Sequence, residues 1–303
     1  MSKFLIVVLF ILLAPAYLAS QGCSDAGVCS MLGDKDIQPE EEKYIAGLSQ
    51  YFGVGDENTV IFNTLLTFDY RSENMDVSVI LPYVYTNGNL GTLSGLGDIK
   101  IAAGFTGSLS EDAAIKFIAG VKFATGEANG KKSGRSLPMV YQPGLGTSDL
   151  MLGASLRLST WVFGVGFQFS DDRTSNKFLH EDWVDEDEAA LHYNQSFKMR
   201  RGMDFMLSVD KFVNFDKTSI YGGIQVIHRN EENNVRRYNF ESEKYEITEQ
   251  NLTTVNLRAG LKNNLTDYAA LHLEVALPIL ARDYAADGLT RSFSAAFGLK
   301  FNL

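Results

Sequence analysis

Apolar and polar residues alternate with a period of two from Tyr44 to the end of the chain. In the segment 75–85, Met, Val, Val, Leu, Tyr and Tyr occupy every second position. Such alternation places the apolar side chains on one face of a strand, and no segment shows a sustained helical period. The pattern predicts about twelve strands, near residues 44–54, 60–70, 75–85, 99–105, 113–123, 150–158, 161–169, 203–209, 219–229, 255–261, 271–279 and 293–303.

The connections between these strands alternate in length. Short connections occupy residues 71–74, 107–111, 159–160, 213–217 and 263–267, and the intervening ones are long, at 86–96, 126–147, 170–197, 230–251 and 283–291. The first, at 55–58, is the exception. Short turns on one side and long loops on the other predict an all-β fold, a transmembrane up-and-down antiparallel barrel of the bacterial outer membrane.

A soluble β-sandwich or a lipocalin-like barrel would also alternate. A sandwich rarely sustains twelve long meander strands, however. Aromatic residues such as Tyr83, Tyr85 and Trp161 also fall near strand ends, as the interfacial girdles of a membrane barrel require. An even number of strands places both ends of the barrel on the short-turn, periplasmic side.

The first twenty residues have the organisation of a secretory signal peptide. Lys3 precedes the apolar run 4–13, and small residues follow up to Ser20. Ten apolar residues are too few for a spanning helix, which needs about 20. We therefore predict a signal peptide at 1–20, a periplasmic segment and candidate plug at 21–42, and the barrel at 43–303.

Cys23 and Cys29 are the two cysteines of the chain. An exported protein meets an oxidising compartment, so we predict a disulfide between them. Acylation of Cys23 is the alternative, but Ser20 stands where a lipobox has leucine. With no histidine or third cysteine nearby, we expect no metal site here.

The polar face of the strands carries charges of both signs. Facing lipid, a lysine or arginine at the membrane midplane costs about 2–4 kcal/mol, so these side chains must point into the barrel. Glycines such as Gly104, Gly164 and Gly260 share the inward face and leave room for a pore. The lumen-lining candidates are Lys100, Lys116, Lys122, Asp204, Asp210, Arg258, Lys262, His272 and Glu274.

We expect these charges to form ion pairs that brace the barrel wall. His272 and Glu274 lie two residues apart on one strand and could meet Arg258 and Lys262 on the adjacent one. No local motif brings serine, histidine and asparagine together as an outer-membrane phospholipase requires. We therefore predict no enzyme, no catalytic residue and no cofactor.

Composition changes this picture little. The 303 residues include 27 basic and 37 acidic ones, for a net charge of −10, and the mean hydropathy of −0.06 is that of an ordinary soluble protein. Barrel strands produce such an average because their two faces cancel. The acidic balance excludes a general nucleic-acid binder, and the apolar content excludes a disordered chain.

Two motifs resemble an outer-membrane transporter family named for the phenol-degradation meta pathway. The first is Ser94–Asp98 (S-G-L-G-D), and the second combines Phe123–Gly126 with Gln142–Asp149. The family pattern is Pro-Thr-Gly and then Gln-Pro-Gly-x-Gly-Ser-x-Asp; here Ala124 replaces the proline and Thr147 the serine. The resemblance covers about residues 44–303 and implies a channel or transporter, distantly similar to hydrophobic-compound channels of the long-chain fatty acid transporter type.

We therefore predict a monomeric channel of the cell outer membrane for passive uptake or efflux of small, hydrophobic or aromatic, molecules. Its partners would be the lipid bilayer, lipopolysaccharide, the barrel-assembly machinery, which would read the terminal strand ending at Leu303, and the solute. Two alternatives stay open: a non-transporting barrel that serves as a surface anchor or adhesin, and a barrel hydrolase.

Overall fold

The computed structural model describes residues 43–170, 172–231, 234–237, 240–246, 252–282 and 293–303. The predicted signal peptide (1–20), the segment 21–42 and the predicted Cys23–Cys29 disulfide lie outside the described residues. Among the residues described, no helix is long and apolar enough to cross a membrane.

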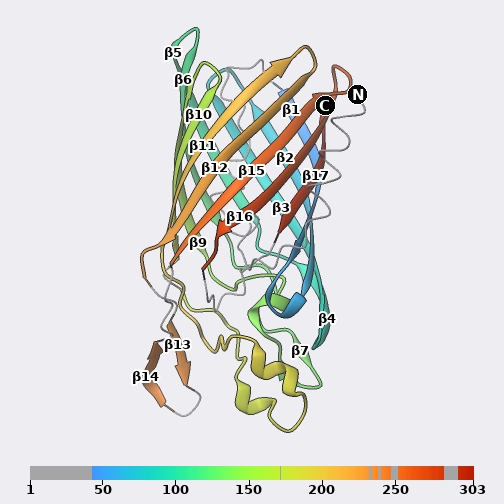
Figure 1. Ribbon diagram of the computed structural model, residues 1–303, viewed down its shortest axis with the longest axis vertical. Coiled ribbons are helices and arrows are strands. Elements are labelled where there is room, and N and C mark those ends of the chain that lie inside the picture. Colours follow the sequence, from blue (N-terminus) through green and yellow to red (C-terminus); the bar gives the residue numbers. More distant parts are fainter. Residues whose placement is uncertain (1–42, 171, 232–233, 238–239, 247–251, 283–292) are drawn as a thin grey trace.

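Twelve antiparallel strands form a closed barrel (Figure 1). Each strand pairs with the next one along the chain, and the ring closes where β1 pairs with both β2 and β17. The predicted up-and-down barrel is therefore confirmed. Its strands are β1 (Lys43–Val54), β2 (Val60–Arg71), β3 (Met75–Gly88), β5 (Lys100–Ser110), β6 (Ala113–Lys122), β9 (Asp149–Leu158), β10 (Trp161–Ser170), β11 (Asp204–Phe215), β12 (Thr218–Arg229), β15 (Thr253–Asn264), β16 (Ala269–Leu280) and β17 (Ser294–Asn302).

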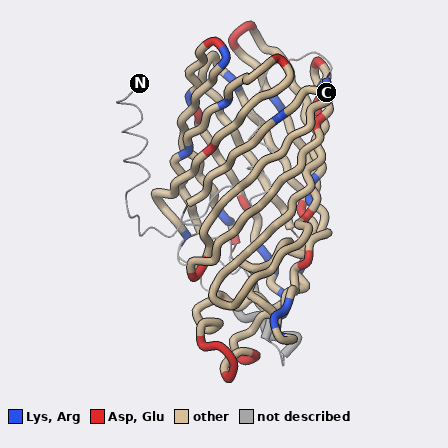
Figure 2. Tube along the Cα trace, turned by 90° about the vertical axis from the view of Figure 1, so that its right-hand side faces the viewer, with Lys and Arg blue, Asp and Glu red and all other residues tan. Residues whose placement is uncertain are grey.

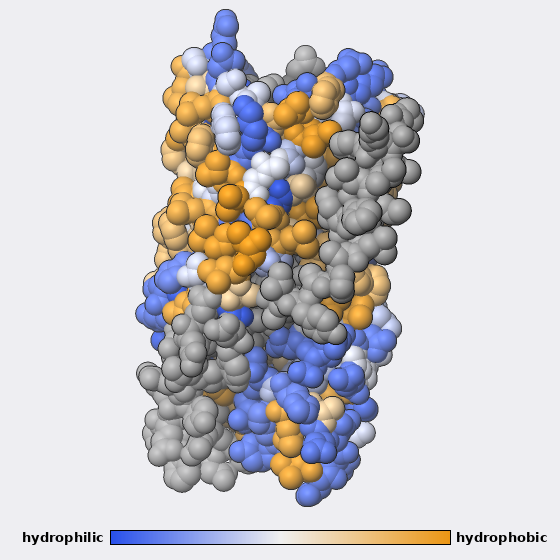
Figure 3. Space-filling model, in the orientation of Figure 1, coloured by the Kyte–Doolittle hydropathy of each residue, from blue (hydrophilic) through white to orange (hydrophobic). Residues whose placement is uncertain are grey.

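The alternating residues of each strand face the exterior and the interior of the barrel in turn. In β5 and β6, Phe105 and Phe117 are more than half exposed, whereas their neighbours Lys116 and Lys122 are buried. Hydrophobic side chains accordingly cover the strands on the visible face of Figure 3, and hydrophilic ones gather at the loop end. This distribution is the reverse of a soluble protein, whose apolar residues lie inside.

The two ends of the barrel differ. One end has only short turns, at 72–74, 111–112, 159–160, 216–217 and 265–268. The other end carries the long connections, with β4 (Gly91–Leu96), β7 (Lys131–Lys132), β8 (Arg135–Ser136), β13 (Asn234–Arg237), β14 (Phe240–Glu246) and the short 3-10 turns η1 (Asp56–Asn58), η2 (Met139–Tyr141), η3 (His180–Asp182) and η4 (Glu188–His192).

One predicted loop is partly a strand. Residues 86–96 form a hairpin, because β3 continues past the end of its pairing with β5 and β4 folds back on it, with Tyr83 opposite Leu96 and Gly88 opposite Gly91. Toward the short-turn end of the barrel, β3 pairs instead with β5, from Met75 to Ile80. The β3–β4 hairpin thus extends the wall on one side of the long-loop end.

Candidate functional site

A hydrophobic core lies at the long-loop end of the barrel, where it also includes residues at the ends of β2 and β3. It joins the β3–β4 hairpin to the connection between β6 and β9 (123–148) and the connection between β10 and β11 (171–203), and we call these three segments together the loop cap. The buried core residues are Ile61, Val84, Leu90, Leu137, Val140, Tyr141, Phe178, Trp183, Ala190 and Tyr193. These loops are therefore a folded unit with its own core.

Hydrogen bonds between the loops reinforce this core. The Trp183 indole Nε1 donates to the carbonyl oxygen of Ser136 at 3.0 Å, and the Asn176 amide donates to the carbonyl oxygen of Ala128 at 2.9 Å. At the cap surface, Arg135 Nη2 lies 2.7 Å from Glu186 Oε1. Buried backbone acceptors are thus satisfied from the neighbouring loop, as stable packing requires.

The β10–β11 connection crosses the mouth of the barrel. The Tyr193 hydroxyl in this connection lies 3.3 Å from Thr59 Oγ1, just before β2, and Asn194 Nδ2 donates to Asp56 Oδ2 at 3.4 Å. In the order of pairing, the β1–β2 and β10–β11 connections are six strands apart in either direction around the twelve-stranded ring. They leave the barrel on opposite sides, so a contact between them requires a chain that spans the opening.

Three hydroxyls meet where this crossing connection docks. The Tyr193 and Tyr141 hydroxyl oxygens are 3.0 Å apart, and Tyr141 also accepts a hydrogen bond from the Leu90 backbone N–H at 3.0 Å. A Cβ at Gly88 would lie 2.7 Å from Thr59 Oγ1 and would collide with the Tyr141 hydroxyl, so a larger residue there would displace these hydroxyls. Burial raises the pKa of Tyr193 above its ordinary value, which keeps the phenol neutral.

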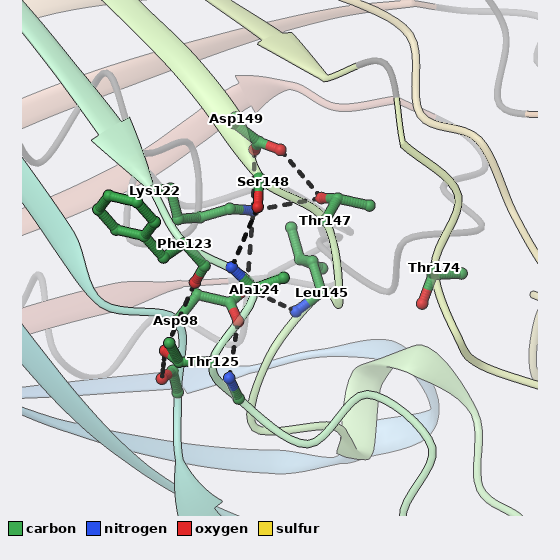
Figure 4. A network of polar contacts seen from close by, with 12 residues as sticks. Asp98, Lys122, Phe123, Ala124, Thr125, Leu145, Thr147, Ser148, Asp149 and Thr174 are labelled. Carbon is green, nitrogen blue, oxygen red and sulfur yellow. Dashed lines mark hydrogen bonds and ion pairs between the residues drawn. The ribbon is translucent and has the colours of Figure 1, made fainter.

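A polar network ties the cap to the barrel wall (Figure 4). Asp98 stands between β4 and β5, and its carboxylate accepts hydrogen bonds from the backbone N–H groups of Gly126 at 3.0 Å and Leu145 at 2.9 Å. Lys122 Nζ lies 3.7 Å from Asp98 Oδ2 and 2.8 Å from Asp149 Oδ2. Gly126, near the start of the β6–β9 connection, and Leu145, near its end, thus bind the same buried carboxylate. Lys122, at the end of β6, pairs with Asp149, at the start of β9.

This network contains the residues that carried the family resemblance. Asp98 closes the first motif, Gly126 ends one half of the second, and Thr147 and Asp149 lie in the other half, where the Thr147 hydroxyl donates to Asp149 Oδ1 at 2.9 Å. A Cβ at Gly126 would lie 2.8 Å from the Gly144 Cα, so the two motif segments cross at a close approach that excludes larger side chains.

Next to this network, three arginines surround one carboxylate. Arg229 holds Asp204 with two bonds, Nε to Oδ1 at 2.9 Å and Nη2 to Oδ2 at 3.1 Å. Arg201 Nη2 also donates to Asp204 Oδ2, and Arg282 Nη1 lies 3.8 Å from Oδ1. Arg201 Nη1 lies 3.9 Å from Asp149 Oδ2 and so connects the two clusters. We call Arg201, Arg229 and Arg282 the arginine triad.

The arginine triad was not among the predicted site residues, although Asp204 was. Arg201 and Arg282 lie just outside their strands, in connections without alternation, so their direction could not be read from the pattern. Arg229 is the last residue of β12 and is directly opposite Asp204 in the pairing with β11. Strand parity could have found Arg229, since the inward position of Asp204 implies the inward position of its partner.

Nearer the short-turn end, ion pairs and hydrogen bonds reach across an intervening strand. Arg258 on β15 holds Asp210 on β11 at 2.7 and 2.9 Å, over Gly223 of β12. The Tyr221 hydroxyl of β12 donates to Glu274 of β16 at 2.6 Å, over Gly260 of β15. We call such an arrangement a glycine saddle.

A third glycine saddle lies on the other side of the barrel. Lys116 Nζ of β6 is 2.7 Å from Asp76 Oδ1 of β3, and Gly104 of β5 lies between them. A Cβ at Gly104 would lie 2.5 Å from Asp76 Oδ1 and 2.8 Å from Lys116 Cε. The space above these glycines is thus occupied by bridging side chains, where the sequence suggested room for a pore.

The remaining predicted lumen residues are Lys100, Lys262 and His272. Lys100 is buried and directly opposite Lys122 in the β5–β6 pairing, and Lys262 is opposite His272 in the β15–β16 pairing. His272 Nε2 lies 3.9 Å from Glu274 Oε2. Within the described part of the chain, no three acidic, histidine or cysteine side chains gather in a way that could hold a metal ion.

No known protein family matches the chain, and no curated protein matches its sequence. Among solved structures, the NanC porin is 10% identical, with 85% of this chain and 100% of that chain covered and a TM-score of 0.50. The β domain of the Bordetella autotransporter BrkA is 11% identical (87% and 100% covered, TM-score 0.45), and the KdgM porin is 8% identical (86% and 99% covered, TM-score 0.44). The similarity to the NanC porin, at this low identity, shows a shared barrel fold.

Proposed function

We propose that this chain is an outer-membrane channel for passive movement of small molecules, here with its mouth closed by the loop cap. One observation carries the proposal: a closed ring of strands turns its apolar residues outward and its charges inward. A closed barrel pairs every strand, so no backbone edge meets hydrocarbon, and its outward apolar side chains, such as Phe105, Phe117 and Leu257, suit lipid as solvent.

The interior favours solutes that carry polar or charged groups. Buried Gln225, Asn256, Asp210 and Arg258 face inward along β11, β12 and β15. Carrying a purely apolar solute past them would strip water and partners from these groups without replacement. Passage of hydrophobic or aromatic molecules, which the family resemblance implies, stays a prediction that the same uptake assays test.

Membrane insertion as a monomer, with contact to bilayer lipid and lipopolysaccharide, belongs to the same proposal. The folded protein is expected in the outer-membrane fraction, and it should migrate faster unboiled than boiled on a gel. A protein that stays in the soluble fraction with one mobility would contradict it.

Conductance across planar lipid bilayers tests the channel directly, and the two tryptophans of the chain provide a matched pair of variants. Trp183 is buried in the cap core, whereas Trp161 lies exposed beside the short turn after β9. We expect Trp183→Ala to loosen the cap and to raise the open probability above that of the wild type. Trp161→Ala, which leaves the cap intact, should not.

A negative result is equally informative. If neither the wild type nor Trp183→Ala conducts ions or admits solutes into liposomes, the channel proposal is wrong, and a surface anchor or adhesin becomes the better account of a capped barrel. Hydrolase assays with Ca²⁺, with His272→Ala as control, test the barrel-hydrolase alternative.

A further inference from the structure

One charged side chain stands on the lipid-facing side of the barrel. Among the described residues of the twelve strands, Lys211 is the only lysine, arginine, aspartate or glutamate at an outward position. It continues the outward row of Leu207, Val209 and Val213 on β11, which are all more than a third exposed. The preceding residue, Asp210, points inward and is fully buried. The alternation of β11 therefore places one positive charge on the outer face, where its neighbours along the strand are apolar.

This lysine lies at the short-turn end of the barrel. Lys211 is directly opposite Trp161, the first residue of β10, which follows the short turn 159–160. Trp161 is exposed, and so are Tyr44 and Phe215 at the same end. Tryptophan and tyrosine collect at the membrane–water interfaces, and a lysine that is costly at the membrane midplane costs little there. The position of Lys211 thus matches the lipid headgroups on the side predicted to be periplasmic.

An aromatic ring and a hydroxyl hold Lys211, and an acid does not. Its Nζ lies 4.7 Å from the centre of the Trp161 ring and donates a hydrogen bond to Thr160 Oγ1. Acidic residues stand in the exposed turns at this end of the barrel (Figure 2), among them Asp112 and Asp216. Yet no acidic side chain in the described part of the chain forms an ion pair with Lys211.

The unused donors at this place can be counted. An ammonium group has three N–H donors, and the one printed contact of Lys211 with an acceptor is that with Thr160. The Thr160 hydroxyl, which accepts this hydrogen bond, keeps its own proton to donate. Within the described residues, two N–H donors and one O–H donor therefore have no acceptor, at a depth where lipid phosphates are the abundant acceptors.

We propose that Lys211 and Thr160, with Trp161 holding the lysine, bind the phosphate group of an anionic phospholipid in the periplasmic leaflet. Hydrogen bonds from an ammonium to a phosphate are charge-assisted and strong, and the indole face orders the ammonium before the lipid arrives. A zwitterionic headgroup carries its own cation, which competes with Lys211 for the phosphate, whereas an anionic headgroup has none. The inference rests on the membrane insertion that belongs to the proposed function, and it is independent of conduction.

Trp161 itself reports on the lipid beside it, because bromine atoms on an acyl chain quench the fluorescence of a tryptophan that they contact. The full-length mature protein is folded into phosphatidylcholine vesicles with a rising fraction of brominated phosphatidylglycerol or, as the reference, brominated phosphatidylcholine. Trp183 is the other tryptophan of the chain and is buried in the cap core, so its emission stays constant. The attraction between one lysine and an anionic lipid surface predicts that phosphatidylglycerol binds beside Trp161 about fivefold more tightly than phosphatidylcholine.

Three variants separate a built site from diffuse surface charge. Lys211→Gln should bind the two lipids equally, and Lys211→Arg, which keeps the charge, should keep the preference. Lys217 is exposed in the turn after β11, so Lys217→Gln removes the same charge at the same end of the barrel and should also keep the preference. The faster mobility of unboiled samples on a gel shows that each variant is folded.

Several outcomes would overturn the inference while leaving the membrane barrel standing. These are equal binding of the two lipids by the wild type, a preference that survives in Lys211→Gln, or a loss in Lys217→Gln as large as in Lys211→Gln. The wild-type comparison decides alone if a variant does not fold. If neither brominated lipid quenches Trp161, the barrel is not surrounded by lipid, and the proposed membrane insertion is wrong together with this inference.

Discussion

Replacing Gly223 with alanine is expected to break the buried Asp210–Arg258 pair without touching either charged residue. Gly223 lies on β12 between the two strands that carry the pair, and Arg258 reaches over it. A Cβ at this position would lie 2.8 Å from Asp210 Cγ and would collide with Asp210 Oδ1 and with the Val209 carbonyl oxygen. The backbone carbonyl cannot rotate away, so the carboxylate or the strand must move.

Two costs of this displacement set the expected loss of stability, the overpacking of the interior and the separation of the ion pair. Overpacking a well-packed interior costs about 1–3 kcal/mol. Separating a buried ion pair costs about 3–5 kcal/mol when one partner is lost altogether. Because Asp210 and Arg258 both remain in the variant and can partly readjust, we expect Gly223→Ala to lower the free energy of unfolding by about 3 kcal/mol, near the bottom of the second range.

Gly222 supplies the control. It is the preceding residue on the same strand, faces outward, and a Cβ there would meet only the Arg258 carbonyl oxygen at 3.8 Å, an ordinary contact. Gly222→Ala should change stability by less than about 1 kcal/mol, since alanine is at most mildly stabilising where the backbone accepts it. Urea unfolding of both variants in lipid, followed by the mobility difference on unboiled gels, measures this. Equal stability of the two variants would refute the glycine-saddle reasoning.

Other consequences of the interior and the cap can be measured in the same way. Asp204→Asn leaves three guanidinium groups facing one another and should destabilise the barrel by about 3–5 kcal/mol, whereas Asp185→Asn on the exposed cap should not. Tyr193→Phe loses the hydroxyl contacts to Thr59 and Tyr141, about 1–2 kcal/mol, so limited proteolysis should cut the cap sooner while the barrel keeps its heat-modifiable mobility. Because burial raises the pKa of Tyr193, its contribution to cap stability is complete below its ordinary value of 10.0 and declines as the pH rises above that value; protease sensitivity of the cap should therefore rise at strongly alkaline pH, and this component should be missing in Tyr193→Phe. Unchanged digestion in either case would contradict the assigned docking contact.

The strands could be predicted from the sequence because a barrel in lipid imposes one rule on every residue. Apolar side chains face out and polar ones face in, so alternation alone locates each strand to within a few residues. The same parity placed Asp210, Lys116 and Arg258 on one face. It could not choose their partners, because a pair such as Asp210 and Arg258 depends on which strands are two apart in the ring and on a glycine between them.

The loop cap could not be predicted for a different reason. Its core residues, such as Tyr141, Trp183 and Tyr193, lie in segments without period two or period 3.6, where apolar residues give no direction. The contact between Thr59 and Tyr193 joins positions 134 residues apart. Only the closed ring shows that they come from opposite sides. The β3–β4 hairpin was predicted as a loop. β4 pairs with β3 only, and its side chains alternate between half-buried and exposed rather than between buried and exposed.

The glycine saddles have a consequence for how the wall resists shear. Neighbouring strands joined only by backbone hydrogen bonds can slip by two residues and still keep every side chain on its proper face. The Asp210–Arg258 pair skips a strand, so one slip on either side of β12 would separate the two charges. Each saddle therefore locks the alignment of three strands at once, and misaligned barrels would carry separated charges in their interior during assembly.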